Sequence, residues 1–447
     1  MKNFFRKVAY GIGPNEDIPS DPLNWALNQV DEIPDFSWKG KIYSEKELRK
    51  HYRDWVYGDR KVLRKKYKDN KTLYKTHKDI LRHKTGQKFW ESLEISIRHN
   101  EGINSNHPVL AKLWMFWGNF FAISEKDFLA NYSTGAYQRE IIRPNLNQSF
   151  EKMVYDVTTS WAMIHHLDNS ESAGPKSVTA GEEWRRRKKE PATINENHGR
   201  ELLELHTVSP KAGYTQEDVI QLAYIMTGWQ HRWSKQNLET GNVWFNSEYH
   251  QRGKKTVLGK EYKRGKKALA AVIKDLVNHP NCRDFVAERL CRYLITDEPT
   301  KEMKQPIIDA FKKSDGHLTE IHKAAIKVAF EYNNKFKKFQ TPENWFIQAA
   351  KIGDLKLGGS SSYTSIAAPA TFPDLTASTI SCSLTIPPRA QFIIITPSFI
   401  KLIVPLEIKS LVAAVRGVCT VIMSERSKIS SIVTRSIGRF NFVSFDI

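Results

Sequence analysis

Apolar residues between positions 15 and 354 recur at intervals of three and four along the chain. This interval places successive apolar side chains on one face of an α-helix. Two stretches that show it are Val219, Leu222, Ala223 and Met226, and Leu269, Val272, Ile273 and Leu276. Alternating, β-branched segments are scarce before residue 355. The pattern predicts a mostly α-helical, multi-helical globular domain over residues 1–354.

Several signals for helix starts accompany this pattern. A Ser or Thr followed three residues later by Asp or Glu can cap the first helical turn. Such pairs occur at Ser44 and Glu47, at Ser124 and Asp127, and at Thr215 and Asp218. In addition, Thr341 directly precedes Pro342, an order typical of a cap followed by a first-turn proline. We expect a helix to begin at each of these four points.

The composition changes near residue 357. No tryptophan follows Trp345, charged residues fall by about half, and Ser plus Thr rise to roughly a quarter of the sequence. Apolar runs in this part have no helical period, and prolines and charges interrupt them too often for a membrane span. Residues 355–447 therefore form a separate Ser/Thr-rich tail without a defined fold class. The tail is either a small β-rich appendage or, as we favour, the poorly ordered product of a shifted reading frame.

The chain is strongly basic, with a net charge of +19. This charge favours an anionic partner such as nucleic acid or phospholipid headgroups, although a solvated basic surface is the simpler explanation and the one we favour. Residues 1–7 are positively charged but lack the apolar segment of a secretory signal, which predicts a cytoplasmic location for the chain as given. The four cysteines form no C-x-x-C pair, so buried, reduced thiols are expected.

Residues 39–88 form a basic subregion in which aromatic residues alternate with lysines and arginines. Its main aromatic residues are Tyr52, Trp55, Tyr57, Tyr67 and Tyr74. Basic and aromatic residues together are typical of single-stranded nucleic-acid binding, where bases stack on the rings. The same aromatic residues are also spaced to pack a helical hairpin against the body of the protein. Both interpretations stay open at this point.

The segment from Asn195 to Thr207 has the most unusual composition in the chain. It combines three carboxylates, one arginine, two asparagines and two histidines within about three turns of predicted helix. At 100° per residue, Leu202, Leu203 and Leu205 form one apolar face, with His198 and His206 among them. The opposite side carries Glu196, Asn197, Arg200, Glu201 and Glu204. The spacing of Arg200 and Glu204 predicts an ion pair.

Two interpretations of this segment compete. In the first, the polar side chains form a hydrogen-bonded network that clamps neighbouring helices. In the second, Glu201 or Glu204 acts as a general base in a cleft that also holds Asp168 and His206. The histidine and glutamate spacing matches neither H-E-x-x-H nor the E-x-x-H of di-iron bundles, so no metal site is predicted. No cofactor motif is present either, and the cofactor is left unknown.

Several ordered blocks of the sequence resemble the bacterial family of unknown function DUF1800. The segment Asn195–Thr207 resembles that family's signature, and Gly213–Val219 and Thr227-Gly228-Trp229 follow it in the expected order. Ile142-Arg143-Pro144 and the Asp168-Asn169 turn also resemble family positions. The resemblance covers residues 4–354 and implies a mostly helical fold with no agreed activity. Many relatives look exported.

The chain departs from the family pattern at three places. The family's tryptophan followed by His-Asn-His-Phe is Trp117 followed by Gly118, Asn119, Phe120 and Phe121 here. The family's His-Asp is His250-Gln251, and its C-terminal block is missing beyond residue 357. Two histidines that a metal site would have used are therefore absent.

Three functions follow from these observations. The first is a structural or partner-binding role built on the Glu/Arg/His network. The second is a hydrolase with Glu201, Glu204, Asp168 and His206 in one cleft, and the third is binding of a polyanion or nucleic acid through residues 39–88. The residues expected to bind or orient a ligand are Arg143, Asn169, Asn195, Asn197, Arg200, Trp229 and His250.

Overall fold

A computed structural model describes residues 2–84, 86–124, 128–181, 194–231, 243–335 and 338–354. Within these residues the fold is mostly α-helical, as predicted, and strands form only two small antiparallel sheets. The tail 355–447, with the reading-frame hypothesis attached to it, lies outside the described residues. None of the described helices combines the length and the apolar character needed to cross a lipid bilayer.

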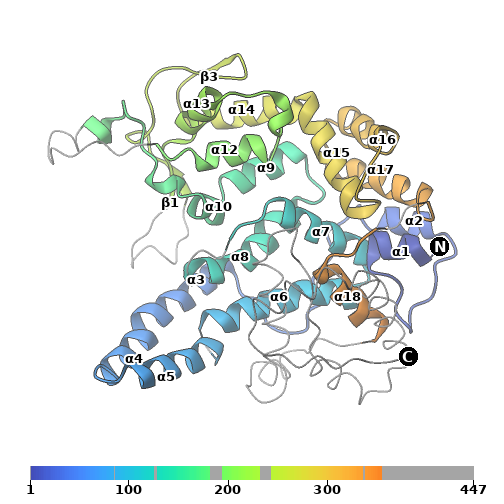
Figure 1. Cartoon of the computed structure of the whole chain (residues 1–447), viewed down its shortest axis with the longest axis horizontal. Coiled ribbons are helices and arrows are strands. Elements are labelled where there is room, and N and C mark those ends of the chain that lie inside the picture. The colour runs from blue at the N-terminus through green and yellow to red at the C-terminus, as the bar shows by residue number, and fades with distance from the viewer. Residues whose placement is uncertain are drawn as a thin grey trace, which may run out of the picture.

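The first half of the chain contains the N-terminal helices, the basic subregion and the helices at the centre of the molecule (Figure 1). The N-terminal helices and the basic subregion comprise α1 (Lys2–Ala9), α2 (Pro22–Asn28), α3 (Glu45–Asp54), the π-helical turn η1 (Trp55–Asp59), α4 (Arg60–Lys66) and α5 (Lys71–Lys84). The central elements are α6 (Gln87–Asn104), α7 (Pro108–Phe120), α8 (Phe128–Tyr137), the π-helical turn η2 (Gln138–Ile142) and the 3-10 turn η3 (Arg143–Asn145).

Most of the second half lies on the side of this centre away from α4 and α5, whereas its last helix packs against α6 (Figure 1). Its first part comprises α9 (Phe150–Thr158), α10 (Trp161–His166), η4 (Asn169–Glu171), α12 (Asn197–Glu204), η5 (Pro210–Ala212) and α13 (Gln216–Met226). Two sheets follow, β1 (Trp229–His231) with β2 (Val243–Phe245), and β3 (Lys255–Val257) with β4 (Lys260–Tyr262). The last helices are α14 (Lys267–Asn278), α15 (Pro280–Leu294), α16 (Lys301–Lys313), α17 (Leu318–Glu331) and α18 (Pro342–Ile352).

Helix α7 forms the centre of the core. Nearly all of its residues are buried, which fits a helix that is apolar on every side. Trp117 packs against Phe121 and Phe150, and its indole Nε1 donates to Nε2 of His322 at 2.8 Å. The predicted apolar faces of α13 and α14 are buried as well. The helical periodicity therefore identified these two buried helix faces correctly.

The predicted helix starts are confirmed where the structure describes them. Ser44 with Glu47 and Thr215 with Asp218 form reciprocal capping boxes. The hydroxyl of Thr341 accepts from the backbone N–H of Asn344 at the start of α18. The box expected at Ser124 includes Asp127, which lies outside the described residues.

Helices α4 and α5 form a hairpin that projects from the rest of the molecule at one end (Figure 1). No residue of α5 is buried, and Leu63 is the buried residue of α4. The chain enters this hairpin through α3 and returns to the body through α6. The hairpin is therefore a part of the fold with little core of its own.

Candidate functional site

Helix α12 carries the Asn195–Thr207 segment, but it is shorter than predicted. The hydroxyl of Thr207 donates to the carbonyl of Leu202 at 2.5 Å, and the N–H groups of His206 and Ser209 bond to the carbonyls of Glu201 and Leu203. These bonds occupy the free carbonyls of the last turn and end the helix. Leu205 follows the helix and is 49% exposed, so the prediction that it belongs to the apolar face is wrong.

The buried side of α12 packs closely on α13. Leu202 and Leu203 are fully buried. A Cβ atom at Gly199 would lie 3.0 Å from the backbone nitrogen of Ala223 and 3.1 Å from the carbonyl oxygen of Val219. Glycine is therefore the residue that lets the two helix backbones approach this closely.

The polar side of α12 forms a three-residue network with the start of α13. Nη2 of Arg200 lies 2.7 Å from Oε1 of Glu196 and 2.7 Å from Oε1 of Gln216. Nε2 of Gln216 completes the triangle by donating to Oε2 of Glu196 at 2.6 Å. The predicted ion pair of Arg200 with Glu204 is wrong, because Arg200 bonds instead to Glu196 one turn earlier and to Gln216 at the start of α13. The backbone N–H of Asn197 is bonded to Oδ1 of Asn195 at 3.0 Å.

The two candidate catalytic carboxylates lie one turn apart on α12 and are partly buried. The hydroxyl of Tyr214 donates weakly to Oε2 of Glu204 at 3.5 Å. Partial burial, and then the neighbouring charge of Glu204, raise the pKa of Glu201. A raised pKa suits a general acid, but it is also the ordinary result of placing two carboxylates one turn apart.

The histidines of the motif lie on the buried side of the segment. His198 is fully buried, and neither of its ring nitrogens has a hydrogen-bond partner. The ring of His206 contacts Phe121, with centroids 5.2 Å apart. Burial, and then the nearby His166, lower the pKa of His206 to about 3. Both histidines are therefore neutral at pH 7, and His206 is packed in the core.

Asp168 and Asn169 form a turn after α10. Asp168 adopts a left-handed backbone conformation, with φ at 56°, and its side chain is exposed. The amide of Asn169 is buried and donates to the carbonyls of Met226 and Trp229, at 3.2 and 2.8 Å. Asn169 therefore ties the turn to the end of α13 and to β1.

Trp229 and His250 are likewise used in packing. Trp229 is buried and packs edge-on against Tyr155 and Phe245. Nδ1 of His250 lies 2.8 Å from the carbonyl oxygen of Thr227, and its Nε2 accepts from the backbone N–H of Gly265 at 3.1 Å. Burial lowers the pKa of His250 to about 4. The neutral ring thus links three loops.

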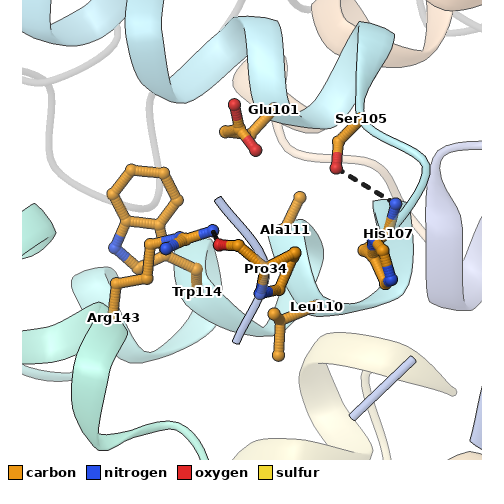
Figure 2. Close-up of a pocket in the computed structure, with 8 residues that line it drawn as sticks. All are labelled: Pro34, Glu101, Ser105, His107, Leu110, Ala111, Trp114 and Arg143. Atoms are coloured by element: carbon orange, nitrogen blue, oxygen red, sulfur yellow. Dashed lines mark hydrogen bonds between the residues drawn. The ribbon is translucent and has the colours of Figure 1, made fainter. Parts of the chain in front are cut away.

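Arg143 lines a small, partly open pocket with a free volume of about 10 Å³ for a water-sized molecule (Figure 2). Its guanidinium lies 4.0 Å from the ring centroid of Phe36 and donates to the carbonyl of Pro34. Opposite it is Glu101, whose carboxylate accepts from both the N–H and the hydroxyl of Ser37 at 2.7 Å. A free volume of about 10–15 Å³ holds one water molecule, so the pocket has no room for a drug-sized ligand. Asp168, Glu201 and Glu204 are not among the residues that line this pocket.

Gly118 and Phe120 stand where the family has histidines, and both are packed in the core. A Cβ atom at Gly118 would lie 3.2 Å from the side-chain carbonyl of Gln138. Phe120 packs against Trp117 and Phe285. Across the described residues, no group of three or more His, Cys, Asp or Glu side chains is arranged to hold a metal ion. These two positions have become part of the core.

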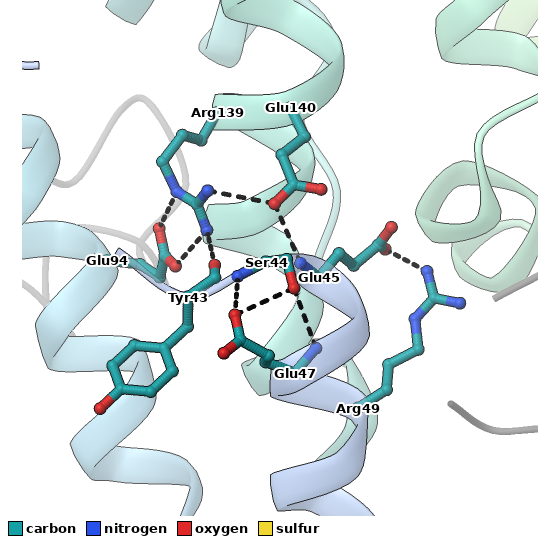
Figure 3. Close-up of polar contacts among 8 residues, drawn as sticks. All are labelled: Tyr43, Ser44, Glu45, Glu47, Arg49, Glu94, Arg139 and Glu140. Atoms are coloured by element: carbon teal, nitrogen blue, oxygen red, sulfur yellow. Dashed lines mark hydrogen bonds and ion pairs between the residues drawn. The ribbon is translucent and has the colours of Figure 1, made fainter. Parts of the chain in front are cut away.

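The sequence did not reveal the most deeply buried ion pair near the hairpin. Arg139 of η2 makes two bonds to Glu94 of α6, at 3.0 and 2.8 Å, and their side chains are only 5% and 6% exposed. Arg139 also donates to the carbonyl of Tyr43, just before α3 (Figure 3). The only sequence feature that pointed to this pair was Glu94 on the inward side of α6. From sequence alone, such a glutamate cannot be distinguished from a surface residue.

A second set of contacts joins α3 to the same point (Figure 3). Oε1 of Glu140 accepts from Arg139 at 3.1 Å and from the backbone N–H of Glu45 at 2.9 Å. The side chain of Glu45 pairs with Arg49 at 2.6 Å, and the guanidinium of Arg49 lies 4.4 Å from the ring centroid of Trp161. The network therefore holds α3 and α6, the two helices at the base of the hairpin, against the body.

The hairpin itself presents a basic surface. Along α5, Lys71, Lys75, Lys78 and Arg82 follow at intervals of four, three and four and so lie on one face. Arg82 pairs with Asp79 at 3.8 Å, whereas the three lysines form no ion pair with a described residue. The rings of Tyr67 and His77 are stacked with centroids 4.6 Å apart, and they join α4 to α5. This stacking stabilises the hairpin. Lys71 and Lys75 are exposed, and Lys78 is half-buried with its Nζ 5.8 Å from the ring centroid of Tyr74.

A family model described as a protein of unknown function (DUF1800) matches residues 19–381. The chain belongs to this family, as the sequence motifs indicated, and the match extends into the tail 355–447. No curated protein and no solved structure matches the chain.

Proposed function

We propose that this DUF1800 member is a partner-binding protein that uses the hairpin α4–α5 to bind an anionic polymer or surface. The observation that carries this proposal is the row of three lysines and one arginine on an exposed helix of a projecting hairpin. Arg82 pairs with Asp79, but the three lysines form no ion pair with a described carboxylate. A row of such positive charges raises the local concentration of anions and accelerates their association. The net charge of the whole chain acts in the same direction.

The Glu/Arg network at the base of the hairpin supports this function in a structural role. A binding element with almost no core of its own needs rigid attachment if its charges are to stay in one orientation. The pair of Arg139 and Glu94 and the contact of Glu140 with α3 supply that attachment. A buried ion pair of this kind holds two elements in one arrangement, because separating the partners would leave a charge in the core without water or a counter-charge.

A polyanion titration tests the proposal. The full chain and the triple variant Lys71→Glu/Lys75→Glu/Lys78→Glu are compared for binding to a mixed-sequence single-stranded oligonucleotide at several salt concentrations. Each lost phosphate contact lowers the slope of log K against log salt by about 0.7, so the slope should fall by about 2. The affinity at low salt should decrease by at least tenfold.

The control carries the same change in charge elsewhere. Lys263, Lys274 and Lys301 are exposed residues outside the hairpin, and their triple replacement by Glu alters the net charge equally. Binding should decrease much less in this variant. Equal losses in the two variants would show that net charge alone drives binding, and no loss in either would overturn the proposal.

A hydrolase is the second candidate function, and one observation favours it. Glu201 and Glu204 lie one turn apart and are partly open to solvent, and the pKa of Glu201 is raised. The double variant Glu201→Gln/Glu204→Gln separates the two functions. It should abolish a hydrolytic activity but leave oligonucleotide binding unchanged, because neither residue belongs to the hairpin.

A further inference from the structure

The hairpin carries exposed apolar side chains in addition to its charges. Among the described residues, eight large hydrophobic side chains are exposed, and four of them fall within the 24 residues from Tyr57 to Ile80. Val62 is 65% exposed, and Leu73 and Ile80 are each 44% exposed. A cluster of apolar side chains on a projecting element is typical of an interaction site, whereas scattered ones need no explanation.

These aliphatic residues are organised relative to the lysines. Leu73 and Ile80 are seven residues apart and therefore share one face of α5, roughly opposite Lys75 and Arg82. Lysines follow one turn after two of them, Lys66 after Val62 and Lys84 after Ile80. In this arrangement a lysine can lay its apolar stem beside the aliphatic residue while its ammonium group stays in water.

We infer that the anionic partner of the hairpin is the headgroup region of a lipid membrane, an inference that rests on the proposed function. Helices with lysines on one side and aliphatic residues on the other lie in the plane of such an interface, with the apolar side in the acyl boundary. Anionic lipids attract each nearby Lys or Arg, and this attraction falls off within a Debye length of the surface.

The basic face also contributes when the aliphatic face is against the membrane. A helix is about 10–12 Å thick, which is close to the Debye length of about 8–10 Å at moderate salt. Lys71, Lys75 and Lys78 therefore still lie within the surface potential. A polynucleotide, in contrast, would leave Val62, Leu73 and Ile80 in water, and its bases would find Tyr67 already stacked on His77.

Vesicle sedimentation tests this inference. The full chain is mixed with vesicles of equal parts phosphatidylglycerol and phosphatidylcholine, with vesicles of phosphatidylcholine alone, and separately with the oligonucleotide. We expect binding to the anionic vesicles, and at least tenfold weaker binding to the neutral ones. The variant Val62→Gln/Leu73→Gln/Ile80→Gln should bind anionic vesicles at least tenfold more weakly but bind the oligonucleotide as before.

The control variant Ile18→Gln/Leu205→Gln/Phe339→Gln removes three exposed apolar residues outside the hairpin and should bind vesicles normally. Circular dichroism and thermal unfolding of each variant confirm that the fold is intact. If the chain binds the oligonucleotide but not anionic vesicles, or if the aliphatic variant binds vesicles as tightly as the unaltered chain, the lipid inference is overturned and the proposed function stands. If neither probe binds, both are overturned.

Discussion

The hairpin α4–α5 and the helix α12 distribute their polar residues in opposite ways. In α12, Arg200 is joined to Glu196 and Gln216, and the neighbouring His198 is fully buried. In α5, no residue is buried, and Lys71, Lys75 and Lys78 form no ion pair with a described carboxylate. The segment with the more reactive composition therefore uses much of its chemistry internally, whereas the plainer one keeps its charges available.

An unusual set of polar side chains does not by itself identify a functional site. A cluster of Glu, Arg and His suggests catalysis only if some of its members are left without partners in a cavity. In the segment Asn195–Thr207 both histidines are buried, and Arg143 lines a separate small pocket. The exposed hairpin, which has no catalytic motif, therefore offers the better site for an external partner.

The largest effect on stability should come from the buried ion pair at the base of the hairpin. Replacing Arg139 by Met leaves Glu94 buried without its partner, which should lower the free energy of unfolding by roughly 3–5 kcal/mol. Urea unfolding measures the loss, and hydrogen exchange should show that α3 and α5 open first. The double variant Glu94→Met/Arg139→Met should recover much of the stability. A loss below about 1 kcal/mol would show that the hairpin does not depend on this anchor.

The next largest contrast is between two leucines, one in each region. Leu203→Ala in α12 removes a fully buried side chain and should cost about 2–5 kcal/mol. Leu73→Ala in α5 removes a side chain that is 44% exposed and should change stability by no more than about 0.5 kcal/mol. Thermal and urea unfolding of the two variants give both values. A large loss for Leu73→Ala would mean that the hairpin packs on something in solution.

Much of the fold could be predicted from local sequence, but most of the site geometry could not. Helix starts and buried helix faces depend on neighbours within one or two turns, and Thr215, Leu222 and Leu276 follow their patterns. Arg200 is bonded to Gln216, which is sixteen residues away in the sequence. Glu94 is bonded to Arg139, which is forty-five residues away. Such choices are made by tertiary contacts, which no periodicity encodes.

A smaller difference between the two regions is expected in the pH dependence of the free energy of unfolding. His206 has a pKa of about 3 in the folded protein and about 6.5 when unfolded, so between these values only the unfolded chain binds the proton. Stability therefore falls as the pH decreases through this range, by about 1.4 kcal/mol per pH unit. Between pH 7 and pH 5 the contribution of His206 is about 2 kcal/mol.

Urea unfolding of the variant His206→Leu at the two pH values measures this contribution. The variant should lose less stability on acidification than the unaltered chain, by about 2 kcal/mol. The matched variant His83→Leu replaces an exposed ring at the end of α5 and is the control for the loss of a histidine as such. If both variants behave like the unaltered chain, His206 is not the source of the acid sensitivity.

The smallest effect is expected where the sequence looked most important. Arg200→Met removes the centre of the network on α12, yet Arg200 and Glu196 are each 35% exposed, and ion pairs of this kind contribute about 0–1 kcal/mol. Once its partner is lost, Glu196 can be solvated by water, which is not possible for Glu94 after the same substitution at Arg139. Urea unfolding of the two Arg→Met variants compares them directly. A loss in Arg200→Met as large as that in Arg139→Met would mean that solvent access does not separate the two networks, and that the polar face of α12 holds the fold together as strongly as the anchor of the hairpin.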